Sequence, residues 1–266
     1  MSAPGSHRPF RGAAWFYAEY RYRPAREFCR LLAQRLGWGP STTVLDLGAG
    51  PAHVSLPLAE LVGEVVVMDP EPDMLAEGRR RAGAAQVGNL TFVAGGSDDL
   101  DGLRARGKTF AGVVISQAFH RMGDQDAVLR RLDPLLGERG AVALVGYVKE
   151  PDYNRIWVDR EPWSVVEEIR GRYVPGAPGP EHDPFPEILA RSAFSEVELL
   201  TLERDLVVCP SAEAALGYEY SLGGVLAALG DRRAAFEAEV REALAGADTS
   251  PHTARLVDSA LIGRRG

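Results

Sequence analysis

The sequence predicts an α/β fold: a doubly wound, mostly parallel sheet of seven strands with a helical cap. Three observations support this prediction. Short apolar runs alternate with segments of helical periodicity, as in chains that cover a parallel sheet with helices on both faces. The first apolar run ends in a glycine-rich turn, Gly48-Ala49-Gly50. The second apolar run ends in a carboxylate, Asp69, which lies 19 residues after Gly50.

The elements follow from the length and periodicity of each run. The run 141–148 is nearly all apolar, which is typical of a strand buried on both faces. The predicted strands are 43–47, 64–69, 90–94, 111–116, 141–148, 196–208 and 253–263. Four predicted helices have bounds from the periodicity: 15–36, which Gly37 ends, 72–85, 211–229 and 231–246. Two more are indicated by apolar residues at helical spacing, one by Val54, Leu58 and Leu61 and the other by Val128, Leu129, Leu132 and Leu135.

The domain organisation is one folded domain behind a short tail. Residues 1–14 have little to bury, so we expect a disordered tail there, followed by a single domain over 15–266. The proline-rich segment 150–190 breaks the alternation of strands and helices. We predict cap elements at 15–36, 150–190 and 211–246, packed over the carboxyl edge of the sheet.

The bulk composition is that of a water-soluble globular protein. The chain has 266 residues, 45% of them hydrophobic, and a net charge of −7. This charge disfavours a nucleic-acid partner. Cys29 and Cys209 lack the spacing of a disulfide framework or zinc site, so we expect no metal. The sequence shows no signal peptide and no apolar run of transmembrane length, and we therefore predict a cytoplasmic protein without a membrane partner.

The glycine turn and Asp69 together predict a nucleotide-type ligand. Glycines allow positive φ and leave the backbone open to a ligand, and a carboxylate after the second strand can hold both hydroxyls of a ribose. Pro51-Ala52-His53 follows the turn, so the Lys and hydroxyl of a phosphate-binding Walker loop are missing. Asp46 would repel a pyrophosphate but could orient an ammonium group.

The segment V-L-D-L-G-A-G-P-A resembles motif I of the class I S-adenosylmethionine-dependent methyltransferases, and 68–75 resembles the segment that follows it in that family. The resemblance implies a Rossmann-like methyltransferase fold with its last strand, 253–263, antiparallel. It also implies S-adenosylmethionine as the cofactor. The residues it places at the cofactor are Asp46, Gly48, Ala49, Gly50, Asp69 at the ribose, Pro70, and Met74 beside the adenine.

The loop after the third strand, F-V-A-G-G-S-D-D-L, resembles the family's adenine loop. Gly96 replaces the usual Asp, so the resemblance assigns the adenine contacts to Ser97 and Asp98. The alternative is that Asp98 and Asp99 cap the following helix.

Two further segments resemble a small-molecule branch of the family that includes trans-aconitate methyltransferase. The first is S-Q-A-F-H-R after the fourth strand, where Arg121 replaces the usual Trp, and where backbone carbonyls at Ser116 and Gln117 would face the methionine ammonium. The second is the N-terminal segment ending in Tyr22-Arg23-Pro24, which implies that Tyr17 and Arg23 close over the methionine end. An amphipathic helix with a solvated arginine is the alternative.

His120 is the predicted general base, because it lies just after the fourth strand and histidine ordinarily titrates near pH 6.5. The alternative is a histidine that stacks on the cofactor or fixes the loop. His182 is a weaker second candidate.

Aromatic residues and acids gather in the predicted cap and could bind a cationic acceptor. The predicted acceptor contacts are Tyr153, Trp157, Trp163 and Tyr220. This pattern favours an amine such as an amino sugar. The alternative is that the acids are solvated and pair with Arg155, Arg160 and Arg170.

Together these features predict an S-adenosylmethionine-dependent methyltransferase, monomeric or homodimeric, that N- or O-methylates a small molecule, with a role in antibiotic biosynthesis or other secondary metabolism. Two alternatives stay open. One is a non-methylating member that uses the cofactor for cyclisation or structure. The other is an NAD-dependent oxidoreductase.

Overall fold

The computed structural model describes residues 10–146, 160–175 and 185–266. Within these ranges the chain forms two compact units. The described part of the sheet unit comprises residues 23–146, 185–204 and 256–266. The described part of the helical unit comprises residues 10–22, 160–175 and 205–255.

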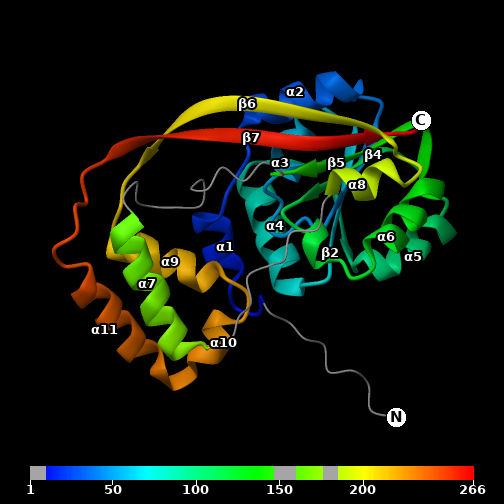
Figure 1. Cartoon of the computed structure of the whole chain (residues 1–266). Helices are drawn as coiled ribbons and strands as arrows, with labels where there is room; N and C mark the ends of the chain where they lie inside the picture. The colour runs from blue at the N-terminus through cyan, green and yellow to red at the C-terminus, as the bar shows by residue number, and fades with distance from the viewer. Residues whose placement is uncertain (1–9, 147–159, 176–184) are drawn as a thin grey trace, which may run out of the picture. The chain divides into compact units, whose positions relative to one another are not determined.

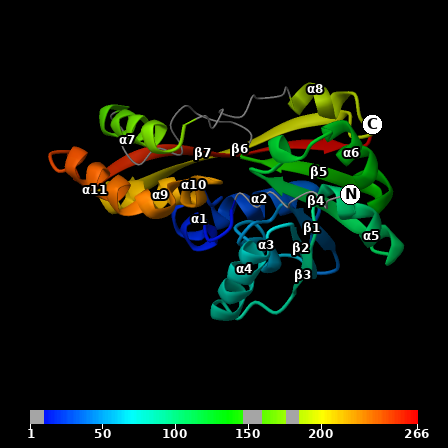
Figure 2. The ribbon, with the colours of Figure 1, turned by 90° about the horizontal axis from the view of Figure 1, so that it is seen from below.

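The sheet has seven strands in the order β3-β2-β1-β4-β5-β7-β6. Strands β1 to β5 pair in parallel, and β7 pairs antiparallel with β5, so the predicted doubly wound, mostly parallel sheet is confirmed. Figures 1 and 2 show β6 beside β7, and both strands continue from the sheet unit into the helical unit. The strands are β1 (Thr43–Leu47), β2 (Glu64–Asp69), β3 (Leu90–Ala94), β4 (Phe110–Ser116), β5 (Leu136–Val145), β6 (Glu196–Val208) and β7 (His252–Arg264).

Helices of the sheet unit cover both faces of the strands, with α3 and α4 on one side and α5 and α6 on the other (Figure 1). Each face has its own apolar core, one including Leu45, Leu47 and Leu103 and the other Val44, Val65 and Leu58. The helices are α2 (Arg26–Leu36), α3 (Ser55–Ala59), α4 (Pro72–Ala84), α5 (Leu100–Ala105), α6 (Gln125–Leu132) and α8 (Phe185–Ala190), with short 3₁₀ turns η1 (Ser97–Asp99), η2 (Phe119–Arg121) and η3 (Asp133–Leu135).

The helical unit has a third apolar core that includes Trp163, Val166, Leu216 and Phe236. Its helices are α1 (Ala14–Tyr20), α7 (Arg160–Tyr173), α9 (Ala212–Ser221), α10 (Val225–Leu229) and α11 (Arg233–Ala243), with η4 at Gly230–Arg232. Ser211 caps α9 by accepting a hydrogen bond from the Ala214 amide over 3.0 Å.

The predicted helix 15–36 is wrong as a single element. The structure has α1 and α2 instead, because Pro24 lacks an amide hydrogen and disfavours helical backbone at the residue before it. Gly37 does close α2 as predicted: its φ is 66°, and the next amide, that of Trp38, donates to the Ala33 carbonyl over 2.8 Å.

Two other predicted boundaries also need correction. The predicted helix 211–229 is interrupted after Ser221, since Gly224 has a φ of 88°. The predicted strand 141–148 instead begins at Leu136 and ends at Val145, where Gly146 turns with a φ of 75°. Residues 147 and 148 lie outside the described part of the chain.

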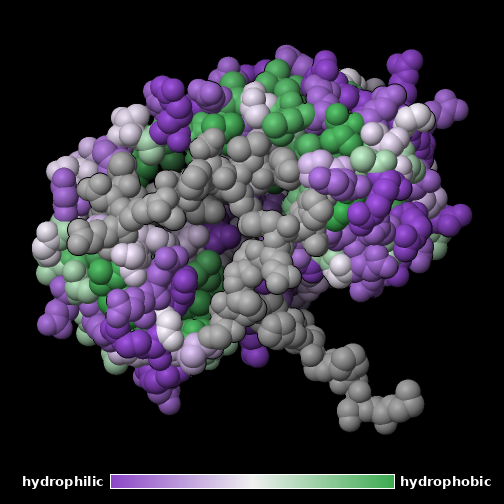
Figure 3. Space-filling model, viewed as in Figure 1, coloured by the Kyte–Doolittle hydropathy of each residue, from purple (hydrophilic) through white to green (hydrophobic). Residues whose placement is uncertain are grey.

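Hydrophilic residues cover much of the face shown in Figure 3, with hydrophobic residues in smaller patches. In the described ranges, no helix combines the length and the apolar character needed to span a bilayer. Both cysteines are free; Cys29 is buried on α2 and Cys209 is exposed after β6.

Candidate functional site

The glycine turn after β1 is held by the carbonyl of Met68 at the end of β2. The amides of Gly48 and Ala49 donate to this oxygen over 2.8 and 3.1 Å. Gly48 and Gly50 have φ values of 71° and 54°, which favour glycine. A Cβ on Gly48 would also lie 2.6 Å from the Cβ of Ala118, so the turn after β4 packs directly against this glycine.

Asp69 ends β2 and faces the same turn. Its Oδ2 accepts a hydrogen bond from the Gly50 amide and its Oδ1 accepts one from the Glu71 amide, both over 2.8 Å. Burial raises the pKa of this carboxyl group, and the two amides act against that rise. Each carboxylate oxygen keeps a lone pair for a further donor, so the group is oriented but still able to bind a diol.

Asp46 lies beneath the glycine turn and is fully buried. The Ser55 hydroxyl, at the start of α3, donates to its Oδ2 over 2.5 Å, while Oδ1 has no hydrogen-bond partner among the described residues. Burial raises the pKa of Asp46 to about 7, and the charge of Asp69 adds to the rise. Sequence reasoning missed Ser55, although a hydroxyl nine positions after the acid, in the first turn of the next helix, was a usable signal.

In the loop after β3, Asp98 and Asp99 have different partners. Asp98 pairs with Arg131 over 2.7 Å and its side chain is 90% exposed. Asp99 accepts a hydrogen bond from the Gly96 amide over 2.9 Å, which is the helix-terminal role given as the alternative. Ser97 begins η1, and its carbonyl accepts a hydrogen bond from Arg131 over 3.3 Å. A cavity of about 370 Å³ adjoins this loop and is lined by residues that include Met68, Val93 and Asp98.

The loop after β4 contains an unusual backbone conformation. Gln117 has a φ of 53°, and its side-chain amide donates to the Gly146 carbonyl over 3.0 Å. His120 follows in η2 and is half-buried, whereas its neighbour Phe119 is buried and packs edge-on against Phe185 at 5.2 Å. Ser116, Gln117 and His120 therefore lie where β4 ends, at the same edge of the sheet as Gly48 and Asp69.

The remaining predicted cofactor residues are spread over the fold. Met74 is buried on α4, and the exposed Pro70 lies near Gly96, whose Cβ would be 3.8 Å from the Pro70 Cβ. Arg23 belongs to the sheet unit, where its carbonyl accepts a hydrogen bond from Arg204. Tyr17 belongs to the helical unit, where Arg21 lies 5.3 Å from the centre of its ring. The roles of all these residues stay predictions.

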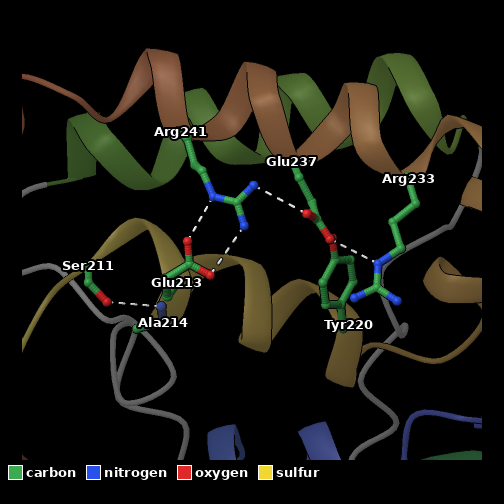
Figure 4. Close-up of polar contacts among 7 residues, drawn as sticks. All are labelled: Ser211, Glu213, Ala214, Tyr220, Arg233, Glu237 and Arg241. Atoms are coloured by element: carbon green, nitrogen blue, oxygen red, sulfur yellow. Dashed lines mark hydrogen bonds and ion pairs between the residues drawn. The ribbon is translucent and has the colours of Figure 1, made fainter.

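The predicted acceptor residues that the structure describes lie in the helical unit. Trp163 is buried and packs edge-on against Tyr218 at 4.9 Å. Tyr220 is also buried, and its hydroxyl donates to Glu237 over 2.7 Å in the polar network between α9 and α11 shown in Figure 4. Tyr153, Trp157 and the second base candidate His182 lie outside the described residues.

The acids near these aromatics have basic partners within the helical unit. Glu219 is fully buried and accepts hydrogen bonds from Arg170 over 3.2 and 3.3 Å, and burial raises its pKa to about 7. Arg172 pairs with Glu168 over 3.1 Å. Pairing with arginines is part of the alternative given above for the acids of the predicted cap, although Glu219 is buried rather than solvated.

A family profile described as "Methyltransferase domain" matches residues 44–140, which carry the glycine turn, Asp69 and the loops after β3 and β4. The chain is 32% identical to the nocamycin O-methyltransferase of Saccharothrix syringae, over 90% of this chain and 92% of that protein. The chain belongs to the S-adenosylmethionine-dependent methyltransferase family.

This membership confirms the predicted class I methyltransferase and its cofactor, S-adenosylmethionine. A structure from Anaeromyxobacter dehalogenans, described as a type II methyltransferase, has a TM-score of 0.54 and 23% identity, and the match covers 92% of this chain and 97% of that one. It supports the fold alone. A 23S rRNA (uracil-C5)-methyltransferase of a Shewanella species is 41% identical over 68 residues, which are 24% of this chain and 15% of that relative's length.

The residues at this edge of the methyltransferase sheet fit the cofactor. The buried Asp46 Oδ1 lacks a donor in the described structure, and the cofactor carries an ammonium group. Asp69 is oriented by two amides and can accept hydrogen bonds from both ribose hydroxyls. When bound, S-adenosylmethionine supplies a methyl group on a sulfonium, which is already activated for transfer.

Proposed function

We propose that this chain transfers the methyl group of S-adenosylmethionine to a hydroxyl group of a small-molecule secondary metabolite. The observation that carries the proposal is the similarity to nocamycin O-methyltransferase along nearly the whole of both chains. The match to the rRNA methyltransferase covers only 68 residues, and a net charge of −7 is unfavourable for binding a phosphate backbone.

Under this proposal three residues at this edge of the sheet have separate roles. Asp69 accepts hydrogen bonds from the ribose hydroxyls, and Asp46 orients the ammonium group. His120 takes the proton from the acceptor hydroxyl as the oxygen attacks. The protein excludes water and aligns the acceptor oxygen with the methyl group, and this alignment supplies much of the rate.

N-methylation of an amino sugar is less well supported. That expectation rests on aromatics and acids of the predicted cap, and the described members of this set pack in a core or pair with arginines. Tyr153 and Trp157 are its remaining support. The trans-aconitate-like branch, a role in antibiotic biosynthesis, a cytoplasmic location and a monomeric or homodimeric state also stay proposals.

The test begins with calorimetric titration of the protein with S-adenosylmethionine and NADH. The protein is then incubated with S-adenosylmethionine and a panel of phenols, aliphatic alcohols, amino sugars and 23S rRNA. We expect S-adenosylhomocysteine to form with hydroxyl acceptors. Formation only with amino sugars or rRNA would contradict the proposal, and cofactor binding without turnover on any acceptor would favour the non-methylating alternative.

The role of His120 is tested by the pH dependence of the rate. Only a neutral imidazole can accept a proton, so the rate of the wild-type enzyme should fall toward acid pH. The variant His120→Asn should be slower and should lose this acid limb. A variant whose pH profile keeps the same shape would show that another group is the base.

A further inference from the structure

The backbone of Gln117 is unusual for its residue type. Its φ of 53° lies in the left-handed region, which costs free energy for any residue with a Cβ. Such conformations persist where the surrounding structure holds them, and they gather at functional sites. Gln117 directly follows β4 and precedes His120 by three positions, and hydrogen bonds hold it there.

Two hydrogen bonds fasten Gln117 to the neighbouring strand. Its amide donates to the Val145 carbonyl over 3.2 Å, and its side-chain Nε2 donates to the Gly146 carbonyl over 3.0 Å. The Gly146 amide in turn donates to the Ser259 carbonyl on β7 over 2.7 Å. The turn after β4 is therefore tied to two strands, β5 and β7.

Gly146 is adapted to this contact. Its φ is 75°, and a Cβ at this position would lie 2.1 Å from the Gln117 Nε2. Because both the backbone angle and the space favour glycine, a side chain at position 146 would displace the Gln117 amide from its acceptor.

The next residue, Ala118, packs against the glycine turn. Ala118 follows Gln117, and its Cβ would lie 2.6 Å from a Cβ on Gly48. The turn after β4 thus packs against the turn after β1, at the edge of the sheet where the cofactor is proposed to bind. A change in the backbone at Gln117 would move Ala118 relative to Gly48.

We propose that the Gln117 side chain is a positioning residue: through Gly146 it holds the turn after β4 against the glycine turn, and so shapes the methionine end of the S-adenosylmethionine site. The inference rests on the proposed placing of the methionine end at this turn. It gives the Gln117 side chain a task that needs no contact with the cofactor, in addition to the backbone role inferred from the sequence.

The test compares Gln117→Gly, which suits the left-handed backbone but removes the hydrogen bond, with Gln117→Glu, which keeps the length but cannot donate. The matched control is Gln86→Gly, because Gln86 also has a positive φ, 54°, but follows α4 away from this turn. Each variant is titrated calorimetrically with S-adenosylmethionine, S-adenosylhomocysteine and 5′-methylthioadenosine, which lacks the amino and carboxyl groups.

We expect both Gln117 variants to bind the first two ligands about tenfold more weakly, with less than about a twofold change for methylthioadenosine. Gln86→Gly should bind all three like the wild type. Gly146→Ala should show the same pattern as the Gln117 variants, and the double variant Gln117→Gly/Gly146→Ala should be no weaker than Gly146→Ala alone.

Unchanged S-adenosylmethionine affinity in both Gln117 variants, or equal weakening of all three ligands, would overturn the inference while leaving the proposed function intact. A wild-type protein that binds none of the three ligands would overturn both. As a contrast within the site, Asp69→Asn should weaken all three, because each ligand has the ribose.

Discussion

At the scale of single residues, Asp69 is the group whose loss should affect cofactor binding most. Asp69→Ala removes a charged acceptor for two hydroxyls, and each such hydrogen bond contributes about 1.5–3 kcal/mol. We expect S-adenosylmethionine to bind at least about 100-fold more weakly in calorimetry. Asp101→Ala, an exposed carboxylate on α5, is the control and should bind normally. Equal affinities for the two variants would show that Asp69 does not hold the ribose.

Asp46 predicts a pH dependence of stability in the cofactor-free protein. Burial raises its pKa from 3.8 to about 7. Between these values the folded protein binds a proton that the unfolded chain has released, so the free energy of unfolding falls as pH rises from about 4 to about 7 and then levels off. One such group changes the slope by at most about 1.4 kcal/mol per pH unit.

Urea unfolding of Asp46→Asn over this pH range should show a flatter fall than the wild type. Glu219 in the helical unit also has a pKa raised to about 7 and contributes in the same direction, so Glu219→Gln is measured alongside. A wild-type slope retained in Asp46→Asn would mean that Asp46 is ionised in the folded protein at neutral pH.

At the scale of elements, an ion pair with a buried carboxylate links β6, β7 and the segment before α2. Asp258 is fully buried and accepts hydrogen bonds from the Ala25 amide over 3.0 Å and from Arg204 Nε over 2.8 Å. Arg204 also donates to the Arg23 carbonyl over 2.9 Å. The pair thus fixes the chain on both sides of Pro24, the residue that separates α1 from α2.

Asp258→Ala leaves Arg204 and the Ala25 amide without this acceptor, and we expect it to lower the free energy of unfolding by about 3–5 kcal/mol. Arg264→Gln is the control on the same two strands, since Arg264 pairs with Glu198 over 2.8 Å and both side chains are partly exposed. It should cost less than about 1 kcal/mol. Similar losses in urea titrations of the two variants would contradict this distinction.

At the scale of the whole molecule, each unit has an apolar core of its own. We therefore expect two transitions in scanning calorimetry. Because the residues assigned to the ribose and the ammonium group lie in the sheet unit, the transition of that unit should shift with S-adenosylmethionine. At about 100 times its dissociation constant the cofactor should stabilise this transition by about 2.7 kcal/mol. Equal shifts of both transitions, or one shared transition, would show that the units unfold together.

The sequence predicts β1 and β2 well because their residues are almost all buried and therefore form apolar runs, whereas β3 and β6 are more exposed and were predicted from shorter or mixed runs. The bounds of β1, β2, β3 and β6 agree with the structure. The single helix over 15–36 was wrong because amphipathic periodicity continues across Pro24, and only the local backbone effect of proline reveals the break. The start of β5 at Leu136 was missed because Gly137-Glu138-Arg139 resembles a turn.

That the loops after β1, β2 and β4 meet at one edge was predictable, because they follow the ends of parallel strands and topology brings such ends together. Contacts between residues far apart in the sequence were not predictable, since no local sequence pattern indicates them. Arg131 pairs with Asp98 across 33 positions, and the Gln117 side chain bonds to Gly146 across 29. The predicted acceptor residues stay a prediction, because aromatics that fill a core and aromatics that line a pocket have the same periodicity.

The two free cysteines offer a chemical handle. Burial raises the pKa of the Cys29 thiol to about 12, so it is both shielded and protonated at neutral pH, whereas Cys209 is exposed in the helical unit. A maleimide dye should therefore label the wild-type protein at one position without any engineered substitution. Fluorescence from that dye would report on the helical unit while unlabelled ligands bind to the protein. Acceptor screening would then have a signal that does not depend on turnover.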